Sequence, residues 1–365
     1  MRAIISGGGS GGHIFPAIAI ANAIKARWSD AEILFIGAKG RMEMERVPAA
    51  GYEIKALPIA GLKRPLYNPK NVAILFRMLR SQLMVRRIIK NFAPDIVVGV
   101  GGYASAPTLK SASQMGYKTL LQEQNSYPGL TNKMLSRHAD RICVAYQGLE
   151  RFFPAQKIVF TGNPVRKDIE QLQATKEEGC RHFGLNPDKP IVLSVGGSLG
   201  AGSINNMIKS NLSYFKDNDV QIVWQTGRWN YEEDLAAVKA ANLEDKVKVH
   251  QFVSRMDLAY SVADVVISRA GAIAISELCI VGKPVILIPS PNVAEDHQTK
   301  NAQALASQGA ALMVRDDECG SKGIPTLAEL LADGERRRSI GEACKRMAVY
   351  GAADKIVDEI EKLTR

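Results

Sequence analysis

The feature that most constrains this chain is a strand followed at once by a glycine-rich loop and a helix, and it occurs twice. Residues 2–13 read RAIISGGGSGGH and lead into a helix expected from about Ile14 to Trp28. Residues 190–202 read PIVLSVGGSLGAG and lead into a helix expected from about Ser203. Short apolar runs separated by helical or loop sequence follow both units and indicate parallel strands joined by helices. The sequence therefore predicts an α/β protein of two similar doubly wound domains with a cleft between them.

The point at which this pattern pauses and restarts indicates the domain boundary. Before it come the runs AEILFIG, DIVVGVGG, KTLLQEQN, RICVA and KIVFTGN, and after it come VQIVWQTG, VKVHQFV, ADVVISRAG and PVILIP. We expect an N-terminal domain over residues 1–163 and a C-terminal domain over residues 164–345. Ligands of such sheets bind at the carboxyl ends of the strands, which is where the glycine loops lie.

Composition limits the class of protein. The formal charge of +10 and the pI near 9.3 favour an anionic partner without saying which one. The five cysteines are scattered, with no CxxC pair and no metal-ligand spacing, as is typical of a reducing compartment. No leader peptide is visible before the first strand, and no apolar run reaches the roughly 18 residues that a bilayer requires. We expect a soluble or peripheral protein that uses no metal and no cofactor.

Residues 268–301 contain the largest group of candidate ligand-binding residues. A loop precedes a helix expected from Ala272 to Val281, which Gly282 ends. The unpaired amides of the first helical turn suit a phosphate group. Glu277 lies about 7.5 Å along the helix axis from its start, where a carboxylate can accept hydrogen bonds from both hydroxyls of a ribose. Polar residues that can reach a sugar at the far end open the next helix: Asp296, Gln298 and Asn301.

The first glycine loop satisfies G-x-G-x-x-G after a strand, the pattern of dinucleotide-binding proteins. That class also needs an acid about 20 residues on, at the end of the second strand, to bind the adenosine ribose. The only acid near that strand is Glu32, at its start, so NAD binding is disfavoured. His13 closes the loop at the head of a helix. It is the candidate catalytic base because imidazole titrates near neutrality, and the alternative is a histidine that only caps or packs.

The second glycine loop can hold a diphosphate through its amides and the Ser198 hydroxyl, or it is a tight turn without a ligand. In the first half, GGYASAP at 101–107 and EQN at 123–125 follow strands on the same carboxyl side as His13. Arg166 lies at the domain junction, where it either neutralises a phosphate or forms a surface salt bridge. Residues 217–219, DND, resemble a metal-chelating DxD but precede a strand, and we interpret them as a turn.

A basic segment from Lys55 to Lys90 contains nine Lys or Arg and no acid. A helix expected from about Asn71 spreads its apolar residues, including Leu75 and Leu79, over about 200° of a helical wheel, which is wider than one core contact requires. The remaining arc carries three cations: Arg77, Arg80 and Arg87. Such a helix can rest on an anionic membrane surface, and the alternative is a core helix with a solvated basic face. Nucleic acid is a poorer match, because no nucleic-acid-binding module accompanies the charge.

Taken together, these motifs resemble one family, the MurG-type bacterial glycosyltransferases of peptidoglycan synthesis. The resemblance covers nearly the whole chain and rests on GGGSGGH at 7–13, GGYASAP at 101–107, EQN at 123–125, GNPVR at 162–166, GGSLGA at 196–201, SRAGA…SE at 268–277 and DHQxxNA at 296–302. It implies a GT-B fold of two Rossmann-like domains, with the final helix, about 346–365, crossing back to the first. It also implies an inverting transfer of N-acetylglucosamine (GlcNAc) from UDP-GlcNAc to the 4-hydroxyl of the N-acetylmuramoyl sugar of lipid I, an undecaprenyl-diphosphate-linked acceptor, giving lipid II and UDP.

The resemblance also assigns roles to residues. It implies donor binding by Ser10, Gly11, Gly12, Asn125, Arg166, Ser198, Val253 (through its backbone, at uracil), Ala272, Ile273, Ala274, Glu277 and Gln298. It implies a catalytic set of His13, as the base, with Tyr103 and Glu123 shaping the acceptor site. The chain departs mildly from the family at two positions. Ser10 stands where threonine is usual, and Gln122 stands where histidine is common, which weakens the case for a base at position 122.

The setting implied by the resemblance is the cytoplasmic face of the bacterial plasma membrane, with the protein held peripherally. Proteins of cell-wall synthesis are candidate partners. One alternative is another GT-B UDP-sugar transferase that acts on a different membrane glycolipid. A second, of a different class, is a UDP-sugar-binding protein without catalysis, which the presence of His13 argues against.

Overall fold

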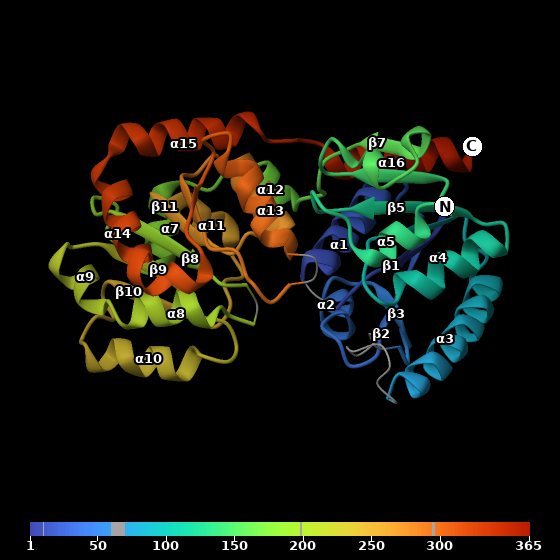
Figure 1. Ribbon diagram of the computed structural model, residues 1–365, viewed down its shortest axis with the longest axis horizontal. Helices are drawn as coiled ribbons and strands as arrows, with labels where there is room; N and C mark the ends of the chain where they lie inside the picture. Colours follow the sequence, from blue (N-terminus) through green and yellow to red (C-terminus); the bar gives the residue numbers. More distant parts are fainter. Residues whose placement is uncertain (10, 60–69, 198, 294–295) are drawn as a thin grey trace. The chain divides into compact units, whose positions relative to one another are not determined.

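The computed structural model describes residues 1–9, 11–59, 70–197, 199–293 and 296–365, and for residues 70–76 the backbone alone. The chain divides into two compact units, which Figure 1 shows with their elements labelled. Unit 1 comprises Met1–Arg166 and Gly351–Arg365, and unit 2 comprises Lys167–Tyr350.

The described residues of unit 1 form a seven-stranded sheet in the order β3-β2-β1-β4-β5-β6-β7. Its strands are β1 (Arg2–Ser6), β2 (Glu32–Ala38), β3 (Glu53–Leu57), β4 (Ile96–Gly99), β5 (Lys118–Glu123), β6 (Arg141–Val144) and β7 (Ile158–Phe160). Its α-helices are α1 (Gly11–Arg27), α2 (Glu43–Ala49), α3 (Lys70–Phe92), α4 (Ser105–Gln114), α5 (Leu130–Leu135) and α16 (Ala352–Thr364).

The described residues of unit 2 form a six-stranded sheet in the order β10-β9-β8-β11-β12-β13. Its strands are β8 (Ile191–Val195), β9 (Gln221–Gln225), β10 (Val247–His250), β11 (Val265–Ser268), β12 (Val285–Leu287) and β13 (Leu312–Met313). Its α-helices are α6 (Lys167–Glu170), α7 (Lys176–Phe183), α8 (Gly202–Lys209), α9 (Leu212–Asp217), α10 (Tyr231–Ala240), α11 (Met256–Val262), α12 (Ala272–Val281), α13 (His297–Ala306), α14 (Cys319–Ala332) and α15 (Gly334–Arg346).

Every strand pair in both sheets is parallel, so the predicted α/β class is confirmed. In unit 1 the chain order reverses between β1 and β4, and in unit 2 it reverses between β8 and β11. Doubly wound sheets bind ligands at this switch point, outside the carboxyl ends of the strands. The two glycine loops follow β1 and β8 directly, so each lies at the switch point of its own sheet.

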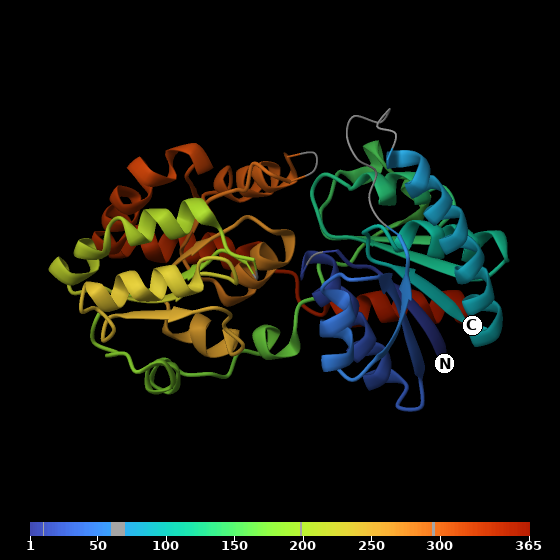
Figure 2. The same ribbon diagram turned by 90° about the horizontal axis from the view of Figure 1, so that it is seen from below.

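The strands are apolar on both faces because helices cover both, as Figures 1 and 2 show. In unit 1, Ala3 and Ile5 face a core shared with α1, α2 and α16. Ile4 lies in the opposite core, shared with α3, α4 and α5. This alternation is the two-residue period of a strand, and it requires a continuous apolar sequence when both faces are buried.

Two expected helices can be compared residue by residue. Helix α12 spans Ala272–Val281 as predicted, and Gly282 ends it with φ of 64°, a left-handed conformation that glycine adopts without strain. Helix α1 begins at Gly11, three residues before the expected start, because the first amides of a helix need no partner within it and glycine is tolerated there. Pro16 therefore lies beyond the first turn rather than inside it, and the helix loses one hydrogen bond at that point.

Helix α16 returns to unit 1 and packs against α1. Ile356, Val357 and Ile360 are fully buried in the core that α1 shares. At the rim, the Arg27 guanidinium donates to Asp358 at 2.8 Å and to Glu361 at 2.9 Å. Burial of the apolar face supplies most of the stabilisation, since exposed ion pairs contribute about 0–1 kcal/mol.

Within the part of the chain that the structure describes, no helix combines the length and the apolarity needed to cross a membrane.

We expect Ile360→Ala to lower the free energy of unfolding by about 2–5 kcal/mol, because it leaves a cavity between α16, α1 and the sheet. Lys355→Ala on the exposed face of the same helix is the matched control, with an expected change within about 0.5 kcal/mol. Urea denaturation followed by circular dichroism measures both. Equal effects of the two substitutions would show that α16 does not contribute to the core of unit 1.

Candidate active site

Two loops of unit 1 touch through their backbones at the switch point. A Cβ atom placed on Gly102 would lie 2.3 Å from the Gly8 carbonyl oxygen, and Gly102 has φ of 86°. A side chain at this position is excluded both by space and by conformation. The Ser105 hydroxyl, in the first turn of α4, donates to the Ser6 carbonyl at 2.6 Å and to the Gly101 carbonyl at 3.0 Å. The loops after β1 and β4 are thus held together as one surface.

His13 lies in the first turn of α1, against this surface. A Cβ atom on Gly101 would be 2.8 Å from both Nε2 and Cδ2 of the imidazole, so the ring rests on the Gly101 backbone. The His13 side chain is half-buried. Tyr103, two residues further along the same loop, is 47% exposed. The structure therefore brings His13 and the loop of Tyr103 together in unit 1, as the motif order predicted.

Glu123, at the end of β5, is a buried carboxylate that organises the following loop. It is 1% exposed. Its Oε1 accepts from the Asn125 amide at 2.9 Å and from Asn125 Nδ2 at 3.1 Å, and its Oε2 accepts from Gly129 N at 3.2 Å and from Asn132 Nδ2 at 2.9 Å. Burial raises the pKa of the Glu123 carboxyl, and the four N–H donors act in the opposite direction. A carboxylate enclosed in this way positions Asn125 and the start of α5.

Gln122, the residue where a histidine would be a candidate base, belongs to a network of three neutral amides. Gln122 Nε2 donates to Asn163 Oδ1 at 3.1 Å, and Asn163 Nδ2 donates to the Gln124 carbonyl at 3.0 Å. Gln124 Nε2 donates to the Val100 carbonyl at 2.8 Å and to Gln122 Oε1. All three amide side chains are buried. The network ties the ends of β4 and β5 to the segment after β7, and a side-chain amide does not act as a base near neutrality.

Glu43, in the first turn of α2, is a residue of this region that the sequence analysis missed. It is 1% exposed, and its carboxylate accepts from Ala38 N at 3.0 Å and from Gly9 N at 2.9 Å. A Cβ atom on Gly8 would be 2.2 Å from Glu43 Oε1. The dinucleotide pattern places its acid at the end of the second strand, whereas Glu43 lies five residues beyond Ala38 and contacts the glycine loop. Its carboxylate binds the loop itself, so it is not presented to a ribose.

In unit 2 a similar backbone contact joins the loops that follow the neighbouring strands β8 and β9. A Cβ atom on Gly200 would lie 2.2 Å from the Thr226 carbonyl, and one on Gly227 would lie 2.1 Å from Gly200 N. Gln225, the last residue of β9, contacts two loops, because its Nε2 donates to the Gly197 carbonyl at 3.1 Å and its Oε1 accepts from Val253 N at 2.9 Å. The Val253 amide is therefore engaged, and the backbone group of Val253 that can accept a hydrogen bond is its carbonyl.

Helix α12 begins and ends as expected, and Glu277 lies in it one turn beyond its first amides. Gly271 precedes the helix in an extended conformation, and the Ile275 amide bonds back to the Gly271 carbonyl at 2.9 Å. Amides of the first turn, at residues 272–274, precede the helical hydrogen-bond ladder and face the helix N-terminus. Glu277 lies one turn further on, and its Oε2 accepts the Tyr260 hydroxyl at 3.0 Å.

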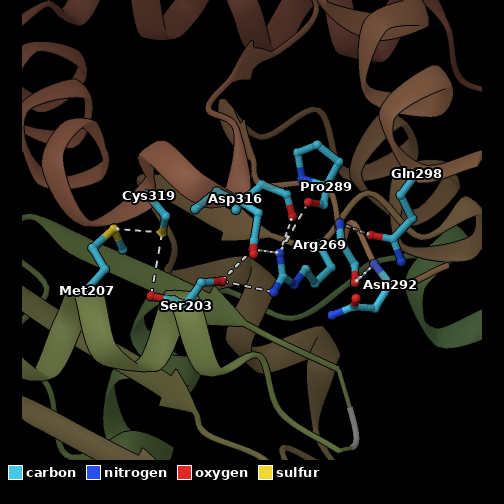
Figure 3. Close-up of polar contacts among 10 residues, drawn as sticks. Ser203, Met207, Arg269, Pro289, Asn292, Gln298, Asp316 and Cys319 are labelled. Atoms are coloured by element: carbon cyan, nitrogen blue, oxygen red, sulfur yellow. Dashed lines mark hydrogen bonds and ion pairs between the residues drawn. The ribbon is translucent and has the colours of Figure 1, made fainter. Parts of the chain in front are cut away.

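Arg269, directly after β11, braces the segment between β12 and α13 (Figure 3). Its Nη1 donates to the carbonyls of Ile288 at 3.1 Å and Pro289 at 3.3 Å and contacts Asp316 Oδ1 at 2.5 Å. Its Nη2 donates to Ser203 Oγ, on α8, at 3.0 Å. The guanidinium therefore joins the helix after the glycine loop to the segment that leads to α13.

That segment orients Gln298. The Ser290 amide, next to the carbonyls held by Arg269, donates to Gln298 Oε1 at 2.9 Å. With the amide oxygen occupied, Gln298 presents its NH₂ group, and it can donate to a hydroxyl or carbonyl oxygen of a ligand. Asn301 on the same helix is buried, and its Nδ2 donates to the Ala270 carbonyl at 3.4 Å.

Comparison with known proteins places the chain in a family. Residues 3–144 match the model "Glycosyltransferase family 28 N-terminal domain", and residues 191–356 match "Glycosyltransferase family 28 C-terminal domain". The chain is 54% identical over 362 residues to a UDP-N-acetylglucosamine--N-acetylmuramyl-(pentapeptide) pyrophosphoryl-undecaprenol N-acetylglucosamine transferase of Parabacteroides distasonis, covering 99% of this chain and 98% of that one. A protein of the same name from Bacteroides fragilis is 53% identical, with 100% of this chain and 96% of that one covered.

The chain belongs to the MurG-type N-acetylglucosaminyltransferases of family 28. The crystal structure of MurG from Acinetobacter baumannii superposes with a TM-score of 0.76 at 26% identity, covering 99% of each chain. The two parallel sheets are accordingly those of the GT-B fold, as the resemblance implied.

In this MurG-type chain each unit collects its own set of the predicted site residues. Unit 1 brings together His13, the loop of Tyr103, Glu123 and Asn125, and Arg166 ends the first of its two segments. Unit 2 collects Val253, the start of α12, Glu277 and Gln298. Ser10 and Ser198 lie outside the described residues, as does the side chain of Leu75.

We expect Glu43→Gln to lower the free energy of unfolding by about 1–3 kcal/mol. Both partners of the carboxylate are N–H donors, so the NH₂ group of glutamine would face a donor and leave a buried amide unsatisfied. Urea denaturation measures the change. Glu45→Gln, on an exposed position of the same helix, is the matched control, with an expected change within about 0.5 kcal/mol. A Glu43→Gln protein as stable as this control would show that the glycine loop does not depend on the carboxylate.

Proposed function

We propose that this chain transfers GlcNAc from UDP-GlcNAc to the 4-hydroxyl of the N-acetylmuramoyl sugar of lipid I, giving lipid II and UDP with inversion at the anomeric carbon. The observation that carries the proposal is the 54% identity, over 99% of the chain, to a transferase named for this donor and this acceptor. The glycine loops at both switch points, each followed by a helix, agree with a donor that contains a diphosphate.

We assign the donor mainly to unit 2. The amides of Ala272, Ile273 and Ala274 hold the diphosphate, the Glu277 carboxylate accepts the ribose hydroxyls, and the Val253 backbone contacts uracil. Gln298 donates to the sugar with the NH₂ group that Ser290 leaves available. Further donor contacts are assigned to Ser198 of unit 2 and to Ser10, Gly11, Gly12, Asn125 and Arg166 of unit 1.

In this mechanism His13 accepts the proton of the acceptor 4-hydroxyl as that oxygen attacks the anomeric carbon. The bond between the anomeric carbon and the diphosphate oxygen breaks, and its electron pair leaves with UDP. The negative charge that develops on UDP lies at the N-terminus of α12, where fixed amides and the helix dipole stabilise it. Attack on the face opposite the leaving group accounts for inversion.

Glu123 and Tyr103 have supporting roles in this proposal. The four donors around Glu123 make it a positioning residue that holds the loop of Asn125, because both carboxylate oxygens are already in hydrogen bonds. Tyr103 extends from the loop that supports His13, and its exposed ring is available to contact the acceptor sugar.

We assign membrane contact to α3, which would hold the protein at the cytoplasmic face of the plasma membrane, where proteins of cell-wall synthesis are candidate partners. Leu79 and Leu83, one helical turn apart, are 61% and 69% exposed. The exposed cations Arg77, Arg80 and Arg87 lie on the same helix. Exposed leucines beside arginines suit an anionic bilayer, where the former enter the interface and the latter pair with headgroups.

Transfer from radiolabelled UDP-GlcNAc to a short-chain lipid I analogue, with EDTA present, tests the function, and labelled product is expected. We expect His13→Ala to lower kcat by about 10²–10⁴-fold, the usual contribution of a general base, with unchanged affinity for UDP. His138→Ala, an exposed histidine of unit 1, is the control. Wild-type turnover by the His13→Ala protein would show that His13 is not the catalytic base. Binding of UDP-GlcNAc without product would instead indicate a different membrane glycolipid as the acceptor.

Vesicle sedimentation tests the membrane assignment. We expect vesicles of phosphatidylglycerol and phosphatidylcholine to sediment the protein more than phosphatidylcholine alone. Changing Arg77, Arg80 and Arg87 together to Glu should lower the partition coefficient by at least about 100-fold, since each lost basic residue contributes about 1 kcal/mol and the new carboxylates are repelled. The same reversal at Lys216, Lys239 and Arg338, exposed in unit 2, is the control for net charge. Equal losses in both triple variants would show that α3 is not the contact.

A further inference from the structure

A buried tyrosine holds the carboxylate that we assign to the donor ribose. Tyr260 is 3% exposed, and its hydroxyl donates to Glu277 Oε2 at 3.0 Å. It lies on α11, all seven residues of which are buried. Glu277 lies on a different helix, α12, and is only half-buried. The hydrogen bond therefore joins the half-buried Glu277 side chain to a tyrosine that is buried in the core.

Helix α11 is anchored at its C-terminal end and along its buried face. At its end, Ser261 Oγ donates to the Thr175 carbonyl at 2.9 Å, and Lys283 Nζ donates to the Ala263 carbonyl at 2.8 Å. It packs on α7 and on β8. The Tyr260 ring accordingly has a defined place that does not depend on a ligand.

The same short segment also carries the backbone assigned to uracil. Val253 lies three residues before α11, and Gln225 holds its amide at 2.9 Å. The carbonyl assigned to uracil and the donor to Glu277 are thus seven residues apart on one stretch of chain. The segment assigned to the base therefore also holds the side chain that contacts the carboxylate assigned to the ribose.

We propose that Tyr260 is a positioning residue that makes the donor site selective for a ribose. Resting on the donor site of the proposed function, the inference is that the tyrosine hydroxyl fixes the Glu277 carboxylate in the orientation that accepts the ribose hydroxyls. An unbraced glutamate samples several rotamers and must be ordered when the nucleotide binds, whereas a braced one is already ordered. Tyr260 itself does not touch the nucleotide; its effect passes through Glu277.

This role predicts a dependence on the substrate that a merely structural tyrosine would not show. If Tyr260 acts through Glu277 on the ribose, removal of the Tyr260 hydroxyl weakens the binding of only those nucleotides that have ribose hydroxyls. If it only supports packing, its removal weakens all uridine nucleotides alike. The two cases separate in a cycle that combines a change in the protein with a change in the ligand.

Calorimetric titration of the full chain with UDP and with 2′,3′-dideoxy-UDP makes this comparison. We expect Tyr260→Phe to weaken UDP binding by about tenfold, as expected for a hydrogen bond to a charged group. The same variant should bind dideoxy-UDP with an affinity within about twofold of the wild type. This ligand lacks the ribose hydroxyls, so the orientation of Glu277 does not affect its binding. Glu277→Gln should weaken UDP at least as much and should abolish the further effect of Tyr260→Phe.

Tyr214→Phe, which removes a hydroxyl from α9 in the same unit, is the matched control and should leave both affinities unchanged. Equal weakening of UDP and dideoxy-UDP by Tyr260→Phe, or no weakening of either, overturns the inference. Wild-type UDP affinity in Glu277→Gln overturns it as well, because the ribose would then have another partner. The titration needs no acceptor, so a failure of transfer to lipid I would change the proposed function and leave this result standing.

Discussion

The arrangement of both candidate sites depends on backbone contacts that only glycine permits. In unit 1 the Gly8 carbonyl occupies the space that a Cβ atom of Gly102 would need, and in unit 2 Gly200 and Gly227 approach each other in the same way. These contacts hold the loops that follow neighbouring strands at the carboxyl edge of each sheet. A helix begins shortly after each loop, so the contacts also fix the direction in which its first-turn amides point.

Buried polar side chains hold these loops through hydrogen bonds to loop backbone and side-chain groups. Glu43 accepts hydrogen bonds from two backbone amides, Glu123 accepts them from four N–H groups, and Gln225 uses both ends of its side-chain amide to join two loops. Buried acceptors of this kind are costly to leave unpaired, so each loop has one favoured conformation. A preorganised loop stabilises developing charge without rearranging, which is where electrostatic catalysis gains its advantage.

The sequence predicted local features well where a residue type favours one local structure. The bounds of α12 followed from an apolar run and a terminal glycine, and the parallel sheets followed from strands that are apolar on both faces. The start of α1 was predicted three residues late, because glycine is common both in loops and in first helical turns. Glu43 and Tyr260 were missed for another reason: each is an ordinary helix residue, and its partner comes from another element.

The sequence by itself determined the class of fold, the family and the identity of the chemical groups, since these depend on periodicity, glycine positions and short motifs. Only the tertiary structure decided which groups are already engaged. It shows that Gln298 has its oxygen occupied, that the Val253 amide is bonded and that Glu123 is enclosed by donors. The reason is physical: a hydrogen bond between distant segments is set by the packing of helices on sheets, and no local pattern records it.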